Sequence, residues 1–210
     1  YRRALEPPPD LPWWQWASAG GVMLLPPVPT PRYGPYDIEW TPHLVGIAMA
    51  LSDPNVWCVT VQKPAQEGCT TFAVVYFLWK ARFDPGNILY VTANVDLARD
   101  KAEETFKPMI EGSPEIAAEL VDDRHNLNAL RFQFKKCTWY NAGGNSAKGL
   151  ASKPVPYIIL DEENKYDQDN EEGDQSELAI ERTNTFHNRK IIRPCTPRTK
   201  KSRGYRAFMQ

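Results

Sequence analysis

The sequence predicts an α/β protein with a mainly parallel central sheet flanked by helices. Three short apolar runs, rich in β-branched and aromatic residues, are typical of buried strands; they span residues 56–61, 88–93 and 157–160. Helical stretches separate these runs along the chain. Strands that alternate with helices favour a parallel sheet, because each parallel pairing needs a crossover connection.

Composition limits the class of protein. Hydrophobic residues make up 42% of the 210 residues and charged residues 24%, which is enough to bury a core and excludes a disordered tail. The longest uncharged apolar run, residues 72–79, is far shorter than the roughly 20 residues of a membrane helix, so we expect no membrane partner. No secretory signal is visible. The chain starts at Tyr1 and not at Met, so we expect it to be a piece of a longer protein.

The first 40 residues differ from the rest of the chain. Residues 1–40 are rich in Pro and Trp, and we expect an arm without regular structure that packs on the core through its tryptophans. A helix is expected to begin at Thr41-Pro42, with Pro at its first position, and to end at Asp53-Pro54. The main domain is then residues 41–210.

The remaining elements follow in order. After the first buried strand and a tight loop, further helices are expected over residues 70–82, 95–109, 114–121 and 175–184. Alternating residues predict a hairpin from segments 130–134 and 137–140, and a last strand is expected over residues 189–193.

The loop after the first buried strand contains part of a phosphate-binding motif. Gly68 permits close backbone approach and Thr70 offers a hydroxyl for Mg²⁺, but Cys69 stands where the usual motif has Lys. Lys63, at the start of the loop, could reach phosphates from the other side. Taken alone, the loop is better explained as a surface turn with one Lys and one Gly.

Two carboxylates at the end of the strand 157–160 change that interpretation. Asp161 can hold Mg²⁺, directly or through water, and Glu162 can polarise the water that attacks a γ-phosphate. Adjacent carboxylates at a strand end are unfavourable unless a cation binds there, although a solubilising loop is the simpler alternative. Together with the phosphate loop, they favour a P-loop NTPase that uses ATP and Mg²⁺.

Two weaker features fit the same chemistry. Thr196, in Cys195-Thr196-Pro197 at the end of the last strand, could sense the γ-phosphate, although Thr-Pro turns are common. Tyr33, Tyr36 and Trp40 are candidates to stack on adenine, or else they pack in the core.

The charge distribution is uneven, although the net charge is −1. Residues 161–181 carry ten acids and one base, whereas residues 182–206 carry nine bases and no acid. This pattern indicates either a cation-binding loop beside a phosphate-binding surface or two solvated faces. The four cysteines are widely spaced, so we expect neither a zinc site nor a disulfide framework.

Together these segments resemble the N-terminal ATPase domain of the large terminase subunit of tailed double-stranded DNA bacteriophages, of the phage-lambda-like type. The resemblance runs from about Leu11 to Phe208. The matching stretches are WTPHLVGIAMALSDP, VQKPAQEG, GGNSAKGLASKPVPYIILDE, EEGDQSELAIERTNTFHNRKII and CTPRTKKSR.

The resemblance implies a viral genome-packaging motor. It implies a P-loop fold of the additional-strand catalytic glutamate type, which hydrolyses ATP to move double-stranded DNA into a procapsid. Implied partners are DNA, further copies of the chain in a ring, the small terminase subunit and the portal protein, all in the host cell cytoplasm. The family also carries a C-terminal nuclease domain, which we expect to be absent from these 210 residues, so no nuclease activity is expected.

The resemblance also assigns roles to particular residues. Lys63 matches the early lysine of a deviant Walker A motif, in which Gly68 and Thr70 match the glycine and hydroxyl. Asp161 and Glu162 match the Walker B aspartate and the catalytic glutamate, and Thr196 falls in the coupling motif. The chain departs from the family at three positions: Cys69 where many relatives have Lys, Gln66 where some have Arg, and Cys195 in place of Ser.

Two questions remain open at the level of sequence. Lys200, Lys201 and Arg203 are candidates for DNA contact, or they belong to a linker whose charge serves only solubility. The alternatives to a packaging motor are another nucleic-acid-dependent ATPase and a nucleotide-binding module with a degenerate phosphate loop and no significant turnover. Cys69 supports the last alternative, whereas the intact Asp161, Glu162 and Thr196 oppose it.

Overall fold

A computed structural model describes residues 8–121, 127–144, 154–166, 174–196, 199 and 202–209. Its main sheet has seven strands in the order β3-β9-β8-β4-β7-β6-β5. The first five are parallel: β3 (Cys58–Gln62), β9 (Lys190–Cys195), β8 (Tyr157–Leu160), β4 (Ile88–Thr92) and β7 (Thr138–Gly143). The antiparallel strands β6 (Arg131–Gln133) and β5 (Leu127–Asn128) extend one edge. The predicted mainly parallel α/β fold is confirmed.

The central strands are apolar because both of their faces are buried. In β4, Ile88 and Tyr90 join the apolar cluster that contains α3 (Cys69–Phe83), whereas Leu89 and Val91 join a second cluster on the other face. Alternate residues of β8 divide between the clusters in the same way. A strand that is covered on both faces favours an apolar side chain at every position, which explains the continuous apolar runs at 88–93 and 157–160. The run 56–61 also predicts a buried strand, but β3 lies at the edge of the sheet and its residues are half-buried.

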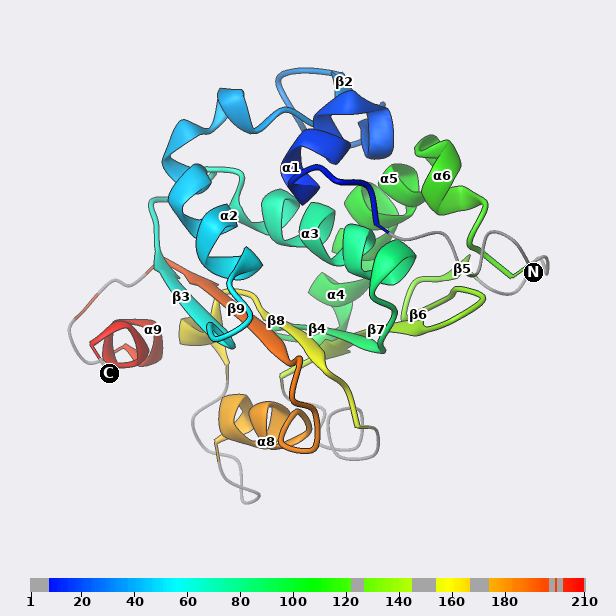
Figure 1. Cartoon of the computed structure of the whole chain (residues 1–210). Coiled ribbons are helices and arrows are strands. Elements are labelled where there is room, and N and C mark those ends of the chain that lie inside the picture. Colours follow the sequence, from blue (N-terminus) through cyan, green and yellow to red (C-terminus); the bar gives the residue numbers. More distant parts are fainter. Residues whose placement is uncertain are drawn as a thin grey trace.

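Helices cover the sheet on both sides (Figure 1). The helix α3 lies against one face, below α1 (Trp13–Trp16) and beside α2 (Val45–Ser52), and α8 (Gln175–Glu181) lies on the other. The other helices are α4 (Val95–Lys101), α5 (Lys107–Gly112), α6 (Pro114–Ala117) and α9 (Arg203–Phe208). Within the described ranges, no helix combines the length and the apolar character that crossing a membrane requires.

Most predicted elements lie where the sequence placed them, within a few residues. The predicted helix at Thr41-Pro42 begins with a 3₁₀ turn, Pro42–Leu44, and Thr41 makes no side-chain cap. The segment 95–109 is helical throughout, but a π-helical turn at Ala102–Phe106 divides it. Predicted helix 114–121 is shorter, because Leu120 pairs with Phe134 instead. The hairpin is confirmed, and β7 also pairs with β4.

The N-terminal residues contain more regular structure than the sequence predicted. Trp13–Trp16 form a helical turn that continues into a π-helix, Ala17–Gly21, and the strands β1 (Met23–Leu24) and β2 (Gly34–Pro35) pair with each other. The expectation of an arm without regular structure is therefore wrong for these residues. Residues three apart lie on the same side of a helical turn, so this turn allows both Trp13 and Trp16 to be buried.

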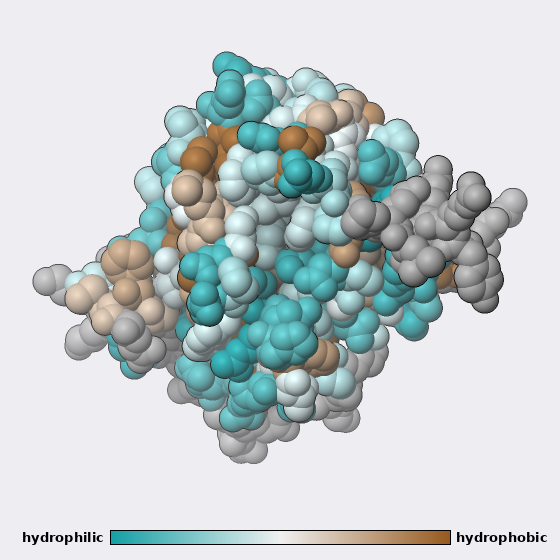
Figure 2. Space-filling view, viewed as in Figure 1, coloured by the Kyte–Doolittle hydropathy of each residue, from teal (hydrophilic) through white to brown (hydrophobic). Residues whose placement is uncertain are grey.

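The surface is mainly hydrophilic on the face that Figure 2 shows, and its hydrophobic residues form small, separate patches. One group of exposed apolar residues, Phe208 and Met209, lies at the end of α9, which projects beside β3. Most other large aromatic side chains of the described residues lie in the core, where Trp13 makes edge contacts with Phe72 and Tyr76 of α3.

We expect Trp13 to anchor the N-terminal residues on α3. The side chain is 3% exposed, so Trp13→Ala should lower the free energy of unfolding by about 3–5 kcal/mol, the usual cost of removing a buried tryptophan. Tyr33, which is 55% exposed, provides the control, and Tyr33→Ala should change the free energy of unfolding by less than about 0.5 kcal/mol. Urea unfolding measures both, and equal effects would contradict the anchoring role.

Candidate active site

The carboxyl ends of three neighbouring strands form the candidate site. Lys63 follows β3, Thr196 follows β9, and Asp161 and Glu162 follow β8. Because these strands are parallel, their carboxyl ends meet at one edge of the sheet, where ligands of open α/β sheets bind. The Lys63 N–H donates to the carbonyl oxygen of Cys195 at 3.0 Å, which ties the start of the loop to the end of β9.

Three side chains converge at this edge. Lys63 Nζ donates to Glu162 Oε1 at 2.8 Å and to Thr196 Oγ1 at 3.3 Å. Thr196 Oγ1 donates to the same Glu162 oxygen at 2.9 Å. One carboxylate oxygen therefore accepts hydrogen bonds from an ammonium and a hydroxyl, each placed by a different strand.

The charges of Lys63 and Glu162 stabilise each other. Burial by itself raises the pKa of Glu162, but the hydrogen bond and charge of Lys63, the hydroxyl of Thr196 and the charge of Lys165 outweigh it, so the pKa is lowered. Burial likewise opposes the charge of Lys63, yet the carboxylate of Glu162 raises its pKa. Glu162 is thus ionised at neutral pH, as a group that accepts a proton from water must be.

Asp161 lies deeper than Glu162 and is only 4% exposed. Its Oδ2 accepts a hydrogen bond from the Tyr90 hydroxyl at 2.9 Å, and Thr70 Oγ1 donates at 3.2 Å to either carboxylate oxygen. Burial raises the pKa of Asp161, although the hydrogen bond from Tyr90 opposes that shift. The Asp161 carboxylate therefore has two hydroxyl partners, and a nearby cation would stabilise its ionised form.

Asp161 and Thr70 fit a magnesium ion. A carboxylate and a hydroxyl are oxygen donors of the kind that Mg²⁺ prefers, and Mg²⁺ commonly takes one or two protein ligands together with phosphate and water. Among the described residues, no cluster of three or more His, Cys, Asp and Glu side chains could enclose a metal ion. The pair therefore suits a metal that arrives with a phosphate ligand.

The backbone of the loop between β3 and α3 is unusual. Gly68 has a φ of 73° and directly precedes α3, a 15-residue helix whose amino end faces the site. Gln66, at a φ of 64°, and Glu162, at 55°, are the two described non-glycine residues with a positive φ. Such strained conformations concentrate at functional sites. Burial raises the pKa of the Cys69 thiol to about 11, so this position supplies no charge to the loop.

The three aromatic residues that are candidates to stack on adenine differ in their surroundings. Trp40 packs against the core and its ring lies 5.2 Å from the guanidinium of Arg32, while Tyr33 is largely exposed. Tyr36 is buried, which raises the pKa of its hydroxyl and leaves it as a core residue near Cys69. A role for Tyr33 or Trp40 in stacking on adenine stays a prediction.

Of the three candidates for DNA contact, Lys200 and Lys201 lie outside the described residues, and so does the side chain of Arg203.

Sequence reasoning missed three residues next to the site: Tyr90, Glu163 and Arg193. Tyr90 is the one hydroxyl-bearing side chain within the apolar run 88–91, and Arg193 directly follows the two buried isoleucines of β9. A polar group in a largely buried strand needs a hydrogen-bond partner, so each residue was a sequence signal for a nearby acceptor. Glu163 is fully buried and pairs with Arg193 through two hydrogen bonds of 2.9 Å.

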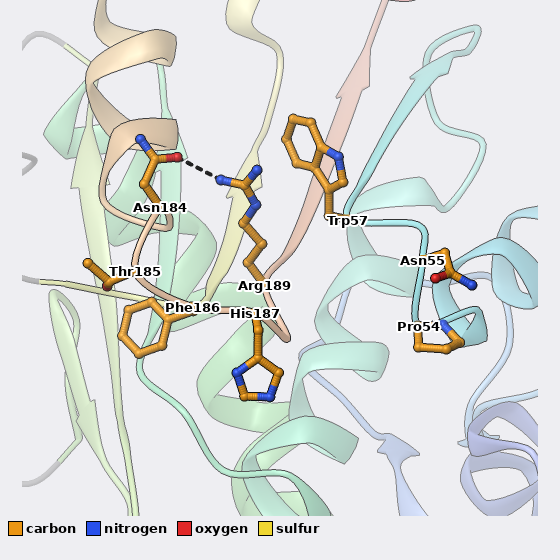
Figure 3. A pocket seen from close by; sticks show the side chains of 8 residues that line it. All are labelled: Pro54, Asn55, Trp57, Asn184, Thr185, Phe186, His187 and Arg189. Carbon is orange, nitrogen blue, oxygen red and sulfur yellow. Dashed lines mark hydrogen bonds between the residues drawn. The ribbon is translucent and has the colours of Figure 1, made fainter.

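A pocket of about 420 Å³ lies at the opposite, amino end of the same strands (Figure 3). Trp57 immediately precedes β3, and the guanidinium of Arg189, just before β9, lies 4.2 Å from its ring. Asn184 Oδ1 accepts a hydrogen bond from Arg189 at 2.6 Å. This pocket is separate from the Lys63–Glu162 edge.

One comparison with known proteins identifies a family. A family model described as the phage terminase large subunit gpA, ATPase domain, matches residues 31–210. A search of curated proteins found no match. The matched range contains every residue of the convergent site described above.

We expect the contact between Lys63 and Glu162 to add stability that disappears in acid. The folded-state pKa of Glu162 lies below its unfolded value of about 4.3, so the contribution is present above that pH and is lost as the pH falls through the folded pKa. At neutral pH, Glu162→Gln should lower the free energy of unfolding by about 1–3 kcal/mol, the usual value for a hydrogen bond to a charged group.

Urea unfolding of the metal-free protein at a series of pH values tests this expectation. The difference between wild type and Glu162→Gln should shrink progressively below the ordinary carboxyl pKa of about 4.3. Glu104→Gln, at an exposed position in the π-helical turn Ala102–Phe106, should show little effect at any pH. A difference between wild type and Glu162→Gln that does not vary with pH would contradict the assignment.

Proposed function

The chain belongs to the gpA ATPase-domain family of phage terminase large subunits, and from that premise we propose that it hydrolyses ATP to drive double-stranded DNA into a procapsid. The observation that carries the proposal is that Lys63 and Thr196 both donate to one carboxylate oxygen of Glu162 at the edge of the sheet. The three groups are a cation for phosphate, a base for water and a hydroxyl that can report which nucleotide is bound.

The chemistry follows from the position of each group. Lys63 exchanges its contact with Glu162 for the terminal phosphate oxygens, while the amino end of α3 receives the other phosphates. Glu162, once released, accepts a proton from the attacking water. Thr70 and Asp161 would hold Mg²⁺, which neutralises charge that develops on the phosphates during transfer.

The strand order supports the additional-strand catalytic glutamate type. The strand β9 lies between β3, which leads into the phosphate loop, and β8, which ends in the two carboxylates. Thr196 at the end of β9 therefore lies between Lys63 and Glu162 and touches both. A change at the γ-phosphate would reach β9 directly through this hydroxyl.

The proposal includes partners that the family suggests. We propose that copies of the chain act as a ring with the portal protein and the small terminase subunit in the host cytoplasm. The loop between Lys63 and Thr70 contains no arginine, so a neighbouring subunit is the proposed source of an arginine that stabilises the transferring phosphoryl group. Lys200, Lys201 and Arg203 are the proposed DNA contacts.

A nucleotide-binding module without turnover is the less favoured alternative. The neutral thiol of Cys69 removes one phosphate-binding charge, but Lys63 already lies beside the catalytic carboxylate and is only 9% exposed at its side chain. The base, the metal-binding carboxylate and the sensing hydroxyl are all present.

We expect Glu162→Gln to abolish most turnover while ATP still binds. Glutamine keeps the size of the side chain but cannot accept a proton, so hydrolysis should fall at least about a hundredfold. Phosphate release measures turnover, and fluorescence titration measures ATP affinity, which should stay close to wild type. Turnover at the wild-type rate would show that another group activates water.

We expect Lys63→Ala to weaken ATP binding and to remove hydrolysis, because this lysine replaces the charge missing at Cys69. Fluorescence titration with ATP should show a loss of about tenfold or more, since charge-assisted hydrogen bonds to phosphate are among the stronger polar contacts. Lys136→Ala, at an exposed position in the β6–β7 turn, is the matched control and should bind ATP normally. Equal affinities in the two variants would contradict this role of Lys63.

A further inference from the structure

We propose that the buried ion pair between Glu163 and Arg193 is a positioning pair, which holds the neighbouring Glu162 where it can act on water. The inference rests on the proposed ATPase function. Neither Glu163 nor Arg193 contacts Lys63 or Thr196 in the described contacts, so the pair acts through the backbone and not on the substrate.

The geometry of the pair is suited to fixing orientation. Arg193 Nε donates to Glu163 Oε1 and Arg193 Nη2 donates to Glu163 Oε2, both at 2.9 Å. The Glu163 side chain is 0% exposed and that of Arg193 is 11% exposed. A two-point contact between a planar guanidinium and a carboxylate fixes direction as well as distance, which a single hydrogen bond does not.

The turn after β8 is held from both faces of the sheet. Asp161 bonds to Tyr90, whose ring belongs to the apolar cluster on the α3 face. Arg193 lies two residues after Ile191 in β9, so its side chain is on the same face as Ile191, which belongs to the cluster on the opposite face of the sheet. Glu163 is therefore anchored on that side. Glu162 lies between these two anchored acids, in the turn that follows β8.

The backbone of Glu162 requires such support. Its φ of 55° and ψ of 44° lie in the left-handed region, which is unfavourable for a residue with a Cβ. Its N–H donates to the carbonyl oxygen of Pro194 at 3.0 Å, and Pro194 directly follows Arg193. The ion pair and this hydrogen bond therefore both join the turn after β8 to the end of β9. Glu162 lies in that turn, and Thr196 directly follows β9.

An apolar replacement of the whole pair separates positioning from simple stabilisation. Removing one partner would leave a buried charge, but replacing both with apolar side chains of similar size is often neutral or stabilising. The test protein is the double variant Glu163→Met/Arg193→Met. The control is Arg82→Met/Glu119→Met, which replaces another buried ion pair near the carboxyl end of α3, away from the phosphate loop.

Two measurements are made on each double variant and on wild type. Steady-state hydrolysis gives kcat and KM for ATP, and amide hydrogen exchange followed by NMR gives the protection of the Glu162 N–H. The second measurement needs no catalytic activity. If wild type does not hydrolyse ATP, the proposed function fails, while exchange at Glu162 still decides whether the pair positions that residue.

We expect the Glu163→Met/Arg193→Met variant to fold and to keep its KM within about threefold, while kcat falls about ten- to a hundredfold, as misplacement of a reacting group by about 1 Å can cause. Exchange of the Glu162 amide should accelerate. The control pair should change neither quantity. A folded variant with wild-type kcat and wild-type exchange at Glu162 would overturn the proposal.

A conservative substitution covers the case in which the double variant fails to fold. Arg193→Lys keeps the charge but replaces the planar two-point contact with a single ammonium, so it should preserve the fold while it loosens the turn. The same pattern is expected, with a smaller fall in kcat and faster exchange at Glu162. Unchanged kcat and exchange in Arg193→Lys would equally overturn the positioning role.

Discussion

Parallel pairing of β3, β9 and β8 is the constraint on which the site depends. It brings the carboxyl ends of three strands, distant in sequence, to one edge of the sheet. Lys63, Glu162 and Thr196 then meet through hydrogen bonds of 2.8–3.3 Å. Because β8 and most of β9 are buried on both faces, these two strands cannot shift register without exposing apolar side chains, and the edge strand β3 is held by its parallel pairing with β9.

Burial of charge at this edge is tolerated because each charged group has a partner. Asp161 accepts from two hydroxyls, Glu162 from Lys63 and Thr196, and Glu163 from Arg193. An unpaired carboxylate in the same surroundings would be protonated or would destabilise the fold. The three consecutive acids thus have different hydrogen-bond partners, so each carboxylate has its own surroundings although the residues are adjacent in sequence.

The helix α9, which follows Thr196 in the sequence, packs against the same end of the sheet as the candidate site. After Thr196, the helix α9 packs beside β3, and the Gly204 N–H donates to Asn164 Oδ1 at 2.8 Å in the turn that follows Glu162. A Cβ at position 204 would lie 2.0 Å from Cys195 Sγ, so only glycine allows this approach. The turn that contains Glu163–Lys165, the end of β9 and α9 are therefore packed together. Figure 1 shows α9 at the β3 side of the sheet.

The sequence by itself determined the fold class and most elements, because doubly buried strands need continuous apolar runs. It also singled out the candidate residues that the structure brings together at one edge of the sheet, because phosphate chemistry needs particular residue types. It did not reveal the helical turn at Trp13, the helix α9, or the partners Tyr90 and Arg193. Those depend on which strands become neighbours. Only the tertiary structure placed Arg193 beside Glu163 and Lys63 beside Glu162, because strand order is set by packing of the whole sheet and not by local pattern.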